Sequence, residues 1–179
     1  VAEGKATSVR IEAGDVQDIL GAPRFENEVA MRVSVPGVAT GLAWTPVGGD
    51  SLWSEAARIA GAGELGLAGQ LGDVMKESAQ AALSLLKSQA ESLGVDATRF
   101  EKSDIHVHIP AGATPKDGPS AGIAIATALV SALSGIPVRG HVAMTGEVTL
   151  RGRVLPIGGL KEKSVAALRA QRTVVVIPH

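Results

Sequence analysis

A serine stands at the start of a predicted helix, in the segment Pro115–Gly122. Gly118 is the expected N-cap and Pro119 the expected first helical residue, because proline has no N–H to leave unpaired there. Ser120 therefore falls in the first turn, where free backbone N–H groups and the positive end of the helix dipole surround its hydroxyl. Such a position binds an anion, or stabilises one that develops during a reaction.

A serine hydroxyl needs a base before it can attack a carbonyl group. A second glycine segment, Gly158–Lys163, begins another predicted helix and places Lys161 and Lys163 in its first turn. The dipole of that turn and the repulsion between two lysines both favour a neutral amine, whereas an ordinary lysine of pKa about 10.4 is almost fully charged near pH 7. The two side chains point roughly 200° apart, so at most one faces Ser120, and the spacing does not say which.

Other interpretations of the serine loop stay open at this point. The base could be a histidine in a His–Asp relay (His106, His108 or His141), or the loop could bind a phosphate without catalysis. His106 and His108 share one face of a predicted strand, which is acceptable geometry for metal ligands. No HExxH or cysteine motif accompanies them, so we favour hydrogen-bonded histidines near the loop.

Composition limits the function classes. The chain has 179 residues, of which 45% are hydrophobic and only 2% aromatic, so we expect a core of Ala, Val, Ile and Leu. A formal net charge of −1 does not indicate a general nucleic-acid or anionic-membrane surface. The absence of cysteine excludes disulfides, thiol catalysis and cysteine metal sites, and is compatible with a reducing compartment.

One uncharged stretch, Gly118–Val138, is long enough to span a bilayer. Gly135 and Pro137 end it early, Ser and Thr interrupt it, and no basic flank or aromatic belt frames it. We therefore expect a helix buried inside a soluble domain. The N-terminus lacks the apolar segment of a signal peptide.

Periodicity and the positions of Gly and Pro predict the elements that must hold the site. We expect strands over Thr7–Ile11, Gly37–Thr45, Leu52–Ile59, Ile105–Ile109 and Val174–Ile177, and helices over Asp15–Leu20, Asp73–Leu93, Pro119–Ser134 and Leu160–Ala170. Gly61–Gly72 is interpreted as a hairpin and loop, and Val142–Thr145 is expected to pair with Glu147–Leu150 around Gly146. The pattern favours an α/β (α+β) fold with a β-rich N-terminal half.

These segments resemble the proteolytic domain of the ATP-dependent Lon proteases, in the A-type branch with an Asp-Gly-Pro-Ser loop. The resemblance implies the Lon proteolytic-domain fold, with mixed sheets and packed helices, and a serine endopeptidase that cleaves unfolded, damaged or regulatory proteins through a Ser–Lys dyad. It rests on several long motifs in the same order over most of the chain: Gly41–Thr45 with Gly48-Gly49, Gly69–Ser78, Asp104–His108 with Pro115–Gly122, Ala143–Glu147 and Leu155–Lys163.

The resemblance also implies roles for individual residues. Ser120 would be the nucleophile and Lys163, not Lys161, the general base. Thr145 would hold the lysine amine through its hydroxyl. Backbone N–H groups around Ser120 would form the oxyanion hole, and the substrate would add a strand beside the sheet.

The resemblance also implies roles for residues of the serine loop and of the substrate groove. Asp117 precedes Gly118 and Pro119 in the loop, where its carboxylate would block or tune the site. Trp44 and Glu55 match family positions near the substrate groove.

Parts outside this sequence are implied as well. Lon proteases carry an AAA+ ATPase module, which uses ATP and Mg, and an N-terminal recognition region; this sequence has no GxxxxGK[ST] loop. We expect residues 1–179 to be a single serine–lysine protease domain of a larger protein, with no cofactor or metal of its own. The full-length protein is expected to be a cytoplasmic homo-hexamer that contacts neither membrane nor nucleic acid in this domain, with the mitochondrial matrix as the alternative location.

Three features depart from the family pattern. Arg169-Ala170-Gln171 lacks the glycine that usually ends the last helix, so we expect that end to be built differently. Leu52-Trp53-Ser54 has an aromatic residue where a smaller or aliphatic one is usual. The sequence stops at His179, soon after the last expected strand, which predicts a truncated or partly disordered C-terminus.

Two alternatives come from other function classes. One is a phosphate-binding or small-molecule kinase-like module that uses the Ser/Gly loop at a helix N-terminus. Pro119 and the loop of Lys163 fit that class less well than they fit a protease. The other is a ring-forming fragment whose site is not assembled, which the relation of Ser120 to Lys163 would reveal.

Overall fold

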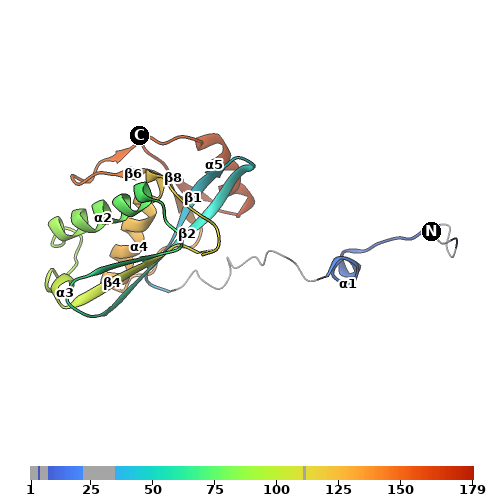
Figure 1. Cartoon of the computed structure of the whole chain (residues 1–179). Coiled ribbons are helices and arrows are strands. Elements are labelled where there is room, and N and C mark those ends of the chain that lie inside the picture. The colour runs from blue at the N-terminus through green and yellow to red at the C-terminus, as the bar shows by residue number, and fades with distance from the viewer. Residues whose placement is uncertain (1–3, 5–7, 22–34, 111) are drawn as a thin grey trace. The chain divides into compact units, whose positions relative to one another are not determined.

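The computed structural model describes residues 4, 8–21, 35–110 and 112–179 (Figure 1). Two compact units divide the chain, Val1–Ala30 and Met31–His179. In the first unit, η1 (Ala13–Asp15) leads into α1 (Val16–Leu20), which ends at Gly21 with φ 82°, so the short helix predicted there is confirmed. The strand predicted over Thr7–Ile11 is wrong for residues 8–11, since no other strand lies in the described part of this unit to pair with them; Thr7 lies outside the described residues.

A six-stranded mixed sheet forms the centre of the second unit. The order is β3-β4-β2-β1-β5-β8, in which β2 is antiparallel to β1 and β4, while the pairs β3–β4, β1–β5 and β5–β8 are parallel. The α/β class is confirmed, and so are the four strands that were predicted in this unit. The strands run over Val38–Thr45 (β1), Gly48–Ala60 (β2), Leu65–Ala68 (β3), Ser103–His108 (β4), Val142–Met144 (β5) and Val174–Val176 (β8).

Two hairpins were predicted from the positions of glycine, one over Gly61–Gly72 and one around Gly146, and both predictions are wrong. The 61–72 segment contains β3, which pairs in parallel with β4. β5 joins the main sheet, whereas β6 (Glu147–Val148) pairs with β7 (Val154–Leu155) in a separate two-stranded sheet. At Gly146 the N–H donates to the Ser120 carbonyl, 2.9 Å away, so the chain leaves the main sheet there without turning back on itself.

Helices α2, α4 and α5 surround the sheet, with a short α3 between α2 and β4 (Figure 1). The predicted helix from Asp73 stops at Ser88, earlier than the apolar period suggested. The hydroxyls of Ser88 and Ser92 donate to the carbonyls of Leu85 and Gln89, which competes with continued helical bonding. The bounds are Asp73–Ser88 (α2), Thr98–Glu101 (α3), Gly122–Ser134 (α4) and Leu160–Arg169 (α5).

The two faces of the sheet are covered by different helices. Gly41 on β1 faces α4, where an added Cβ would lie 3.2 Å from the Cβ of Ala124. The next residue, Leu42, packs with Ala166 and Ala167 of α5. Because successive side chains of a strand point to opposite faces, α4 and α5 lie on opposite sides of the sheet.

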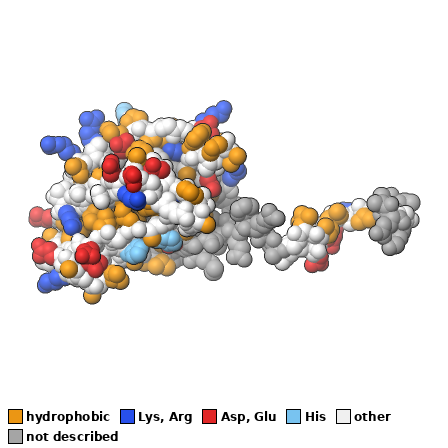
Figure 2. Space-filling model, viewed as in Figure 1, with side chains coloured by type: hydrophobic (Ala, Val, Ile, Leu, Met, Phe, Trp, Pro, Cys, Tyr) orange, Lys and Arg blue, Asp and Glu red, His pale blue; other side chains and the backbone are white. Residues whose placement is uncertain are grey.

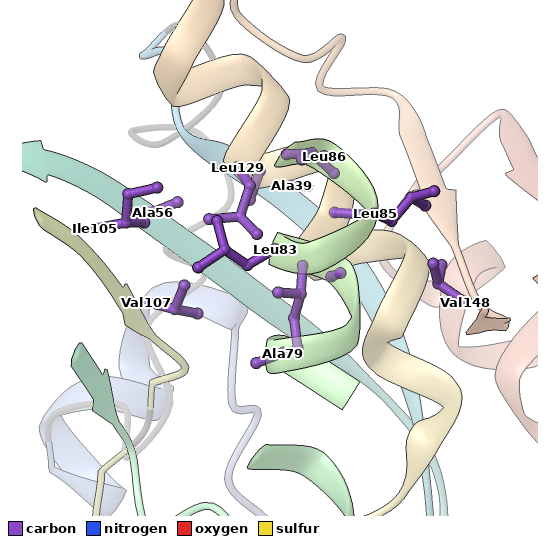
Figure 3. Packing of buried hydrophobic residues seen from close by; sticks show 14 of the residues in the cluster. Ala39, Ala56, Ala79, Leu83, Leu85, Leu86, Ile105, Val107, Leu129 and Val148 are labelled. Carbon is purple, nitrogen blue, oxygen red and sulfur yellow. The ribbon is translucent and has the colours of Figure 1, made fainter. Parts of the chain in front are cut away.

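The larger core lies between the sheet and the pair α2 and α4 (Figure 3). Ala79 and Leu83 of α2 pack near Leu129 of α4 and Val107 of β4, and Figure 3 shows these side chains converging. Alanine allows the helix backbones to approach closely, so the core needs few aromatic residues, as the composition predicted.

The uncharged stretch that begins at the serine loop is the buried helix α4. Its Ile125, Ala128 and Leu129 have no exposed surface. Within the described ranges, no helix combines the length and the apolar character needed to cross a membrane. On the face seen in Figure 2, Lys/Arg and Asp/Glu side chains are interspersed, without a large patch of one sign.

The end of α5 is closed by a residue in the left-handed region. Gln171 has φ 55°. The Arg172 N–H donates to the Ala167 carbonyl (2.9 Å) and the Gln171 N–H to the Leu168 carbonyl (3.0 Å), which are the two bonds of a Schellman motif. The expectation of a differently built helix end is therefore wrong, because glutamine adopts the conformation that glycine usually supplies.

This conformation predicts that Gln171→Gly stabilises the domain. A side chain with a Cβ costs about 1 kcal/mol in the left-handed region, and glycine removes that cost. We expect the free energy of unfolding to rise by about 1 kcal/mol and the Tm by about 2–4 °C. Chemical denaturation of Gln171→Gly and of Gln171→Ala, which keeps the Cβ, measures the effect. Equal stability of the two variants would contradict the interpretation.

Candidate active site

A cavity of about 480 Å³ opens where the carboxyl end of β1 meets the 3-10 turn before α4 and the first turn of α5. Ser120 and Lys163 both line it, and so do Asp117, Pro119 and Trp44. The two segments that the sequence singled out thus meet in one cavity. Two helix N-termini converge there, so their dipoles favour negative charge and oppose a cation.

Ser120 lies in η3, a 3-10 turn over Pro119–Ala121 that leads directly into α4. Gly118 is its N-cap with φ 113°, and Pro119 is the first helical residue, as predicted. The Ser120 carbonyl accepts hydrogen bonds from the Gly146 N–H (2.9 Å) and the Thr145 hydroxyl (3.4 Å). Its backbone is therefore anchored to the segment that follows β5.

Lys163 is the lysine of the pair that points inward. Its side chain is buried, with 2% of the residue exposed, whereas Lys161 is exposed. Burial lowers the pKa of the Lys163 amine below its usual range, because a charged ammonium loses its hydration inside the protein. Spacing alone could not say which lysine faces Ser120. In the structure Lys163 points into the protein and Lys161 points outward.

Glycines bring α5 close enough to deliver this amine. Gly159 is the N-cap of α5 with φ 69°, and an added Cβ would lie 2.9 Å from the Cβ of Trp44. Gly49 packs against the first turn, where an added Cβ would lie 2.0 Å from the Glu162 carbonyl oxygen. The β1–β2 hairpin therefore rests directly on the turn that carries Lys163.

Thr145 connects the two halves of the site. It is 1% exposed and follows β5 directly. Its Oγ1 accepts a hydrogen bond from Lys163 Nζ (3.2 Å) and donates to the Ser120 carbonyl (3.4 Å). Within the described part of the chain, no hydrogen bond joins the Ser120 hydroxyl to Lys163 Nζ, although both residues line the same cavity.

Asp117 has a structural contact that sequence reasoning did not anticipate. Its Oδ1 accepts hydrogen bonds from the N–H groups of Met75 (2.9 Å) and Gly118 (2.8 Å). Gly72, the N-cap of α2, has no side chain, and an added Cβ would lie 2.3 Å from the Asp117 Cγ. Asp117 therefore caps α2 from another segment and ties the serine loop to that helix.

Ser78 is a second supporting residue that the sequence analysis missed. It is 7% exposed, and its hydroxyl donates to the Pro119 carbonyl at 3.4 Å. An added Cβ on Gly122 would lie 2.8 Å from this hydroxyl oxygen, so helices α2 and α4 approach closely at this point. The sequence did contain a signal for this role, since Ser78 is a polar residue on the otherwise apolar face of α2.

Of the two residues predicted near the substrate groove, Trp44 and Glu55, only Trp44 lines the cavity. Trp44 lines the cavity and is 56% exposed. Glu55 is not among the lining residues; its Oε2 lies 3.4 Å from Nδ1 of His108, its cross-strand partner. His106 is exposed on the same strand, and the described residues contain no group of three or more His, Asp or Glu that could hold a metal ion.

Comparison with known proteins identifies the family. Residues 10–179 match the Lon protease (S16) C-terminal proteolytic domain. The chain belongs to this family. Lon protease of Methylocella silvestris is 64% identical over 178 residues, and that of Phenylobacterium zucineum is 63% identical over 177, each match covering 99% of this chain. Lon protease 2 of Myxococcus xanthus is 60% identical over 179 residues, the whole of this chain.

The match gives the chain its chemical class. Lon proteins of this family are serine-type peptidases, so this chain is the proteolytic domain of a serine protease. The resemblance inferred from the motifs is thereby confirmed. The chain spans 22% of the length of these three relatives.

Burial of the Lys163 amine predicts a specific pH dependence of stability. Between the lowered pKa of Lys163 and its ordinary value of 10.5, the unfolded chain binds more protons than the folded Lon domain. Stability should therefore rise with pH through this window, and Lys163→Met should lose that rise. At neutral pH the methionine variant should be more stable by on the order of 1 kcal/mol, because no ammonium is buried.

Denaturant unfolding between pH 7 and pH 10 measures the difference between wild type and Lys163→Met. The matched control is Lys161→Met, which removes an exposed lysine and should leave the pH dependence of wild type. Parallel curves for wild type and Lys163→Met would show that the amine is not desolvated.

Proposed function

We propose that this Lon domain hydrolyses peptide bonds by acyl transfer, with Ser120 as nucleophile and Lys163 as general base. The observation that supports this most directly is the buried Lys163 amine, held by Thr145 in the cavity that Ser120 lines. A lysine can act as a base only when it is neutral, and burial favours the neutral form.

The hydrogen bonds around Lys163 leave its basic site available. A neutral amine has two N–H donors and one lone pair, and one N–H is used on Thr145 Oγ1 at 3.2 Å. Thr145 uses its own proton on the Ser120 carbonyl, so it does not occupy the lone pair of the amine. The lone pair is then the acceptor for the Ser120 hydroxyl proton.

The reaction proceeds in two balanced steps. Ser120 Oγ attacks the peptide carbonyl as its proton passes to Lys163, and the resulting ammonium returns that proton to the leaving amine. Water then attacks the acyl-enzyme ester as one of its protons passes to Lys163, and the ammonium gives that proton to Ser120 Oγ as the acid product leaves. Backbone N–H groups in the first turn of the serine helix stabilise the oxyanion in both steps.

Attack requires a hydrogen bond between the Ser120 hydroxyl and the Lys163 amine, and a change in the serine loop can form it. Ser120 has no hydrogen bond to Lys163 in its 3-10 turn, and Gly118, with φ 113°, is the residue best able to change the path of the loop. Asp117, bonded to the N-terminus of α2, holds the loop in the observed conformation. We propose that release of this contact allows Ser120 to reach the amine.

The substrate backbone binds to a free strand edge. β1 pairs with β5 only at Gly41 and Met144, so the following residues of β1 have no paired strand on that side among the described residues. Ala43 and Trp44 of this edge line the cavity. An extended peptide added there forms main-chain hydrogen bonds regardless of sequence, which suits a protease of unfolded or damaged proteins.

The remaining proposals concern the whole protein. Since the chain spans 22% of its relatives' length, we propose that residues 1–179 are a single serine–lysine protease domain of a longer Lon protein. By the family resemblance, that protein would be a cytoplasmic, ATP-dependent homo-hexamer for protein quality control, with ATP and Mg bound in a separate AAA+ module.

Active-site labelling tests the dyad. A peptide boronate should bind wild type covalently, and Ser120→Ala should abolish the adduct, whereas an ATP-binding kinase-like module would not react. Lys163→Ala should lower peptidase activity about 10²–10⁴-fold because the general base is lost. Lys161→Ala is the matched control and should keep full activity. The opposite result for the two lysines would overturn the base assignment.

Backbone methylation of the substrate tests strand addition separately. A peptide boronate that is N-methylated at the amide facing Ala43 should bind about 5–10-fold more weakly, since one main-chain hydrogen bond is lost. The same peptide methylated at an amide that points away from β1 should bind like the parent. Equal affinities would show that the peptide does not pair with this strand.

A further inference from the structure

A second hollow, which we call the α2–β6 groove, adjoins the cavity that Ser120 lines. Its volume is about 180 Å³, and Pro119, the residue before the serine, lines both hollows. A water molecule occupies about 30 Å³ in the liquid, so the groove has room for a side chain of several heavy atoms. A peptide bound at Ser120 therefore passes close to the mouth of this groove.

Helix α2 and strand β6 form the walls of the groove. The residues contributed by α2 are three or four positions apart and share one helix face: Val74, Glu77, Ser78 and Ala81. Val148 of β6 lines the groove with them. The hydroxyl of Ser78 donates to the Pro119 carbonyl at 3.4 Å, so the groove is fastened to the serine loop.

Two carboxylates line the groove, from Glu77, which is exposed, and Glu147, which is half-buried. Neither glutamate forms an ion pair with another described residue. Among the described residues no Lys or Arg lines the groove, and Lys76, the neighbour of Glu77, is bonded to Asp73 at 3.2 Å. The groove therefore offers negative charge that the protein itself does not neutralise.

Apolar walls with carboxylates match the two parts of a lysine or arginine side chain. The aliphatic stem packs against apolar surface while the cationic head stays in contact with water and with acidic groups. A long apolar side chain would use the walls alone, and an acidic one would be repelled by both glutamates. The groove is thus suited to a basic side chain.

The place of the groove indicates which part of a substrate reaches it. In the proposed reaction the acyl part of the peptide pairs with β1, whose Ala43 and Trp44 line the catalytic cavity. No described residue of β1 lines the groove, which is reached past Pro119. The leaving part of the peptide continues away from β1 beyond the serine, so this is the part that meets the groove.

We propose that the α2–β6 groove is a subsite for a basic side chain in the leaving part of the substrate, with Glu77 and Glu147 as the residues that determine this specificity. The proposal rests on the proposed function, because Ser120 marks the position of the bond that is cleaved. The domain then cleaves preferentially where Lys or Arg follows within a few residues.

Internally quenched peptides test the subsite. Each carries arginine, or its neutral isostere citrulline, at one of the first three positions after the bond that mass spectrometry shows to be cleaved. With the full chain we expect kcat/KM to be about 5-fold higher for arginine at one of these positions, the effect of a partly exposed ion pair. Arginine before the cleaved bond should show no preference that depends on the two glutamates.

Variants assign the preference to the groove. Glu77→Gln and Glu147→Gln should each reduce the arginine preference, and the double variant should abolish it while kcat/KM for the citrulline peptide stays unchanged. Glu101→Gln, at an exposed position of α3, is the matched control and should keep the preference.

Peptide binding to Ser120→Ala separates the subsite from the acyl-transfer chemistry. This variant cannot form an acyl-enzyme, so fluorescence anisotropy measures the affinity for the same peptides alone. Tighter binding of the arginine peptide supports the subsite even if wild type cleaves neither peptide, a result that contradicts only the Ser–Lys mechanism. Equal cleavage and equal binding of the two peptides, or a preference that persists in the double variant, overturns the subsite.

Discussion

The structure of this domain depends on placing one amine in an almost fully buried position at the side of a cavity. Lys163 is 2% exposed, and its amine donates a hydrogen bond to Thr145. Folding must bury this group although its charged form prefers water, so the surrounding packing supplies the compensating free energy. Leu42 with Ala166 and Ala167 fastens α5 to the sheet, and Gly49 allows the hairpin to close over the first turn of the helix.

The serine is held by a different set of contacts. Asp117 and Ser78 attach the serine loop to α2, whereas Thr145 and Gly146 attach the Ser120 carbonyl to the segment after β5. Lys163 and Ser120 are therefore positioned by separate helices on opposite faces of the sheet, and Thr145 is bonded to both. Lys163 is buried in packed surroundings, whereas the serine loop contains Gly118, whose backbone has more conformational freedom than that of any other residue type.

Sequence reasoning succeeded where local chemistry determines local structure. Gly118 and Pro119 mark the start of the serine helix because their backbone preferences are strong at that point. It failed where partners are distant: the pairing of β3 with β4, and of β6 with β7, depends on which strand arrives alongside. Spacing could not choose between Lys161 and Lys163, since burial depends on the packing of α5. Nothing local marked Asp117 as a cap for α2.

The parallel pairing of Gly41 with Met144 has a consequence for how the protein is made. Strand β1 emerges early from the ribosome, the serine much later, and the amine on α5 later still. Parallel pairing between segments so far apart in sequence is a late event in folding. A growing chain that has reached only α4 contains Ser120 without Lys163, so the proposed dyad can form only when synthesis has delivered α5.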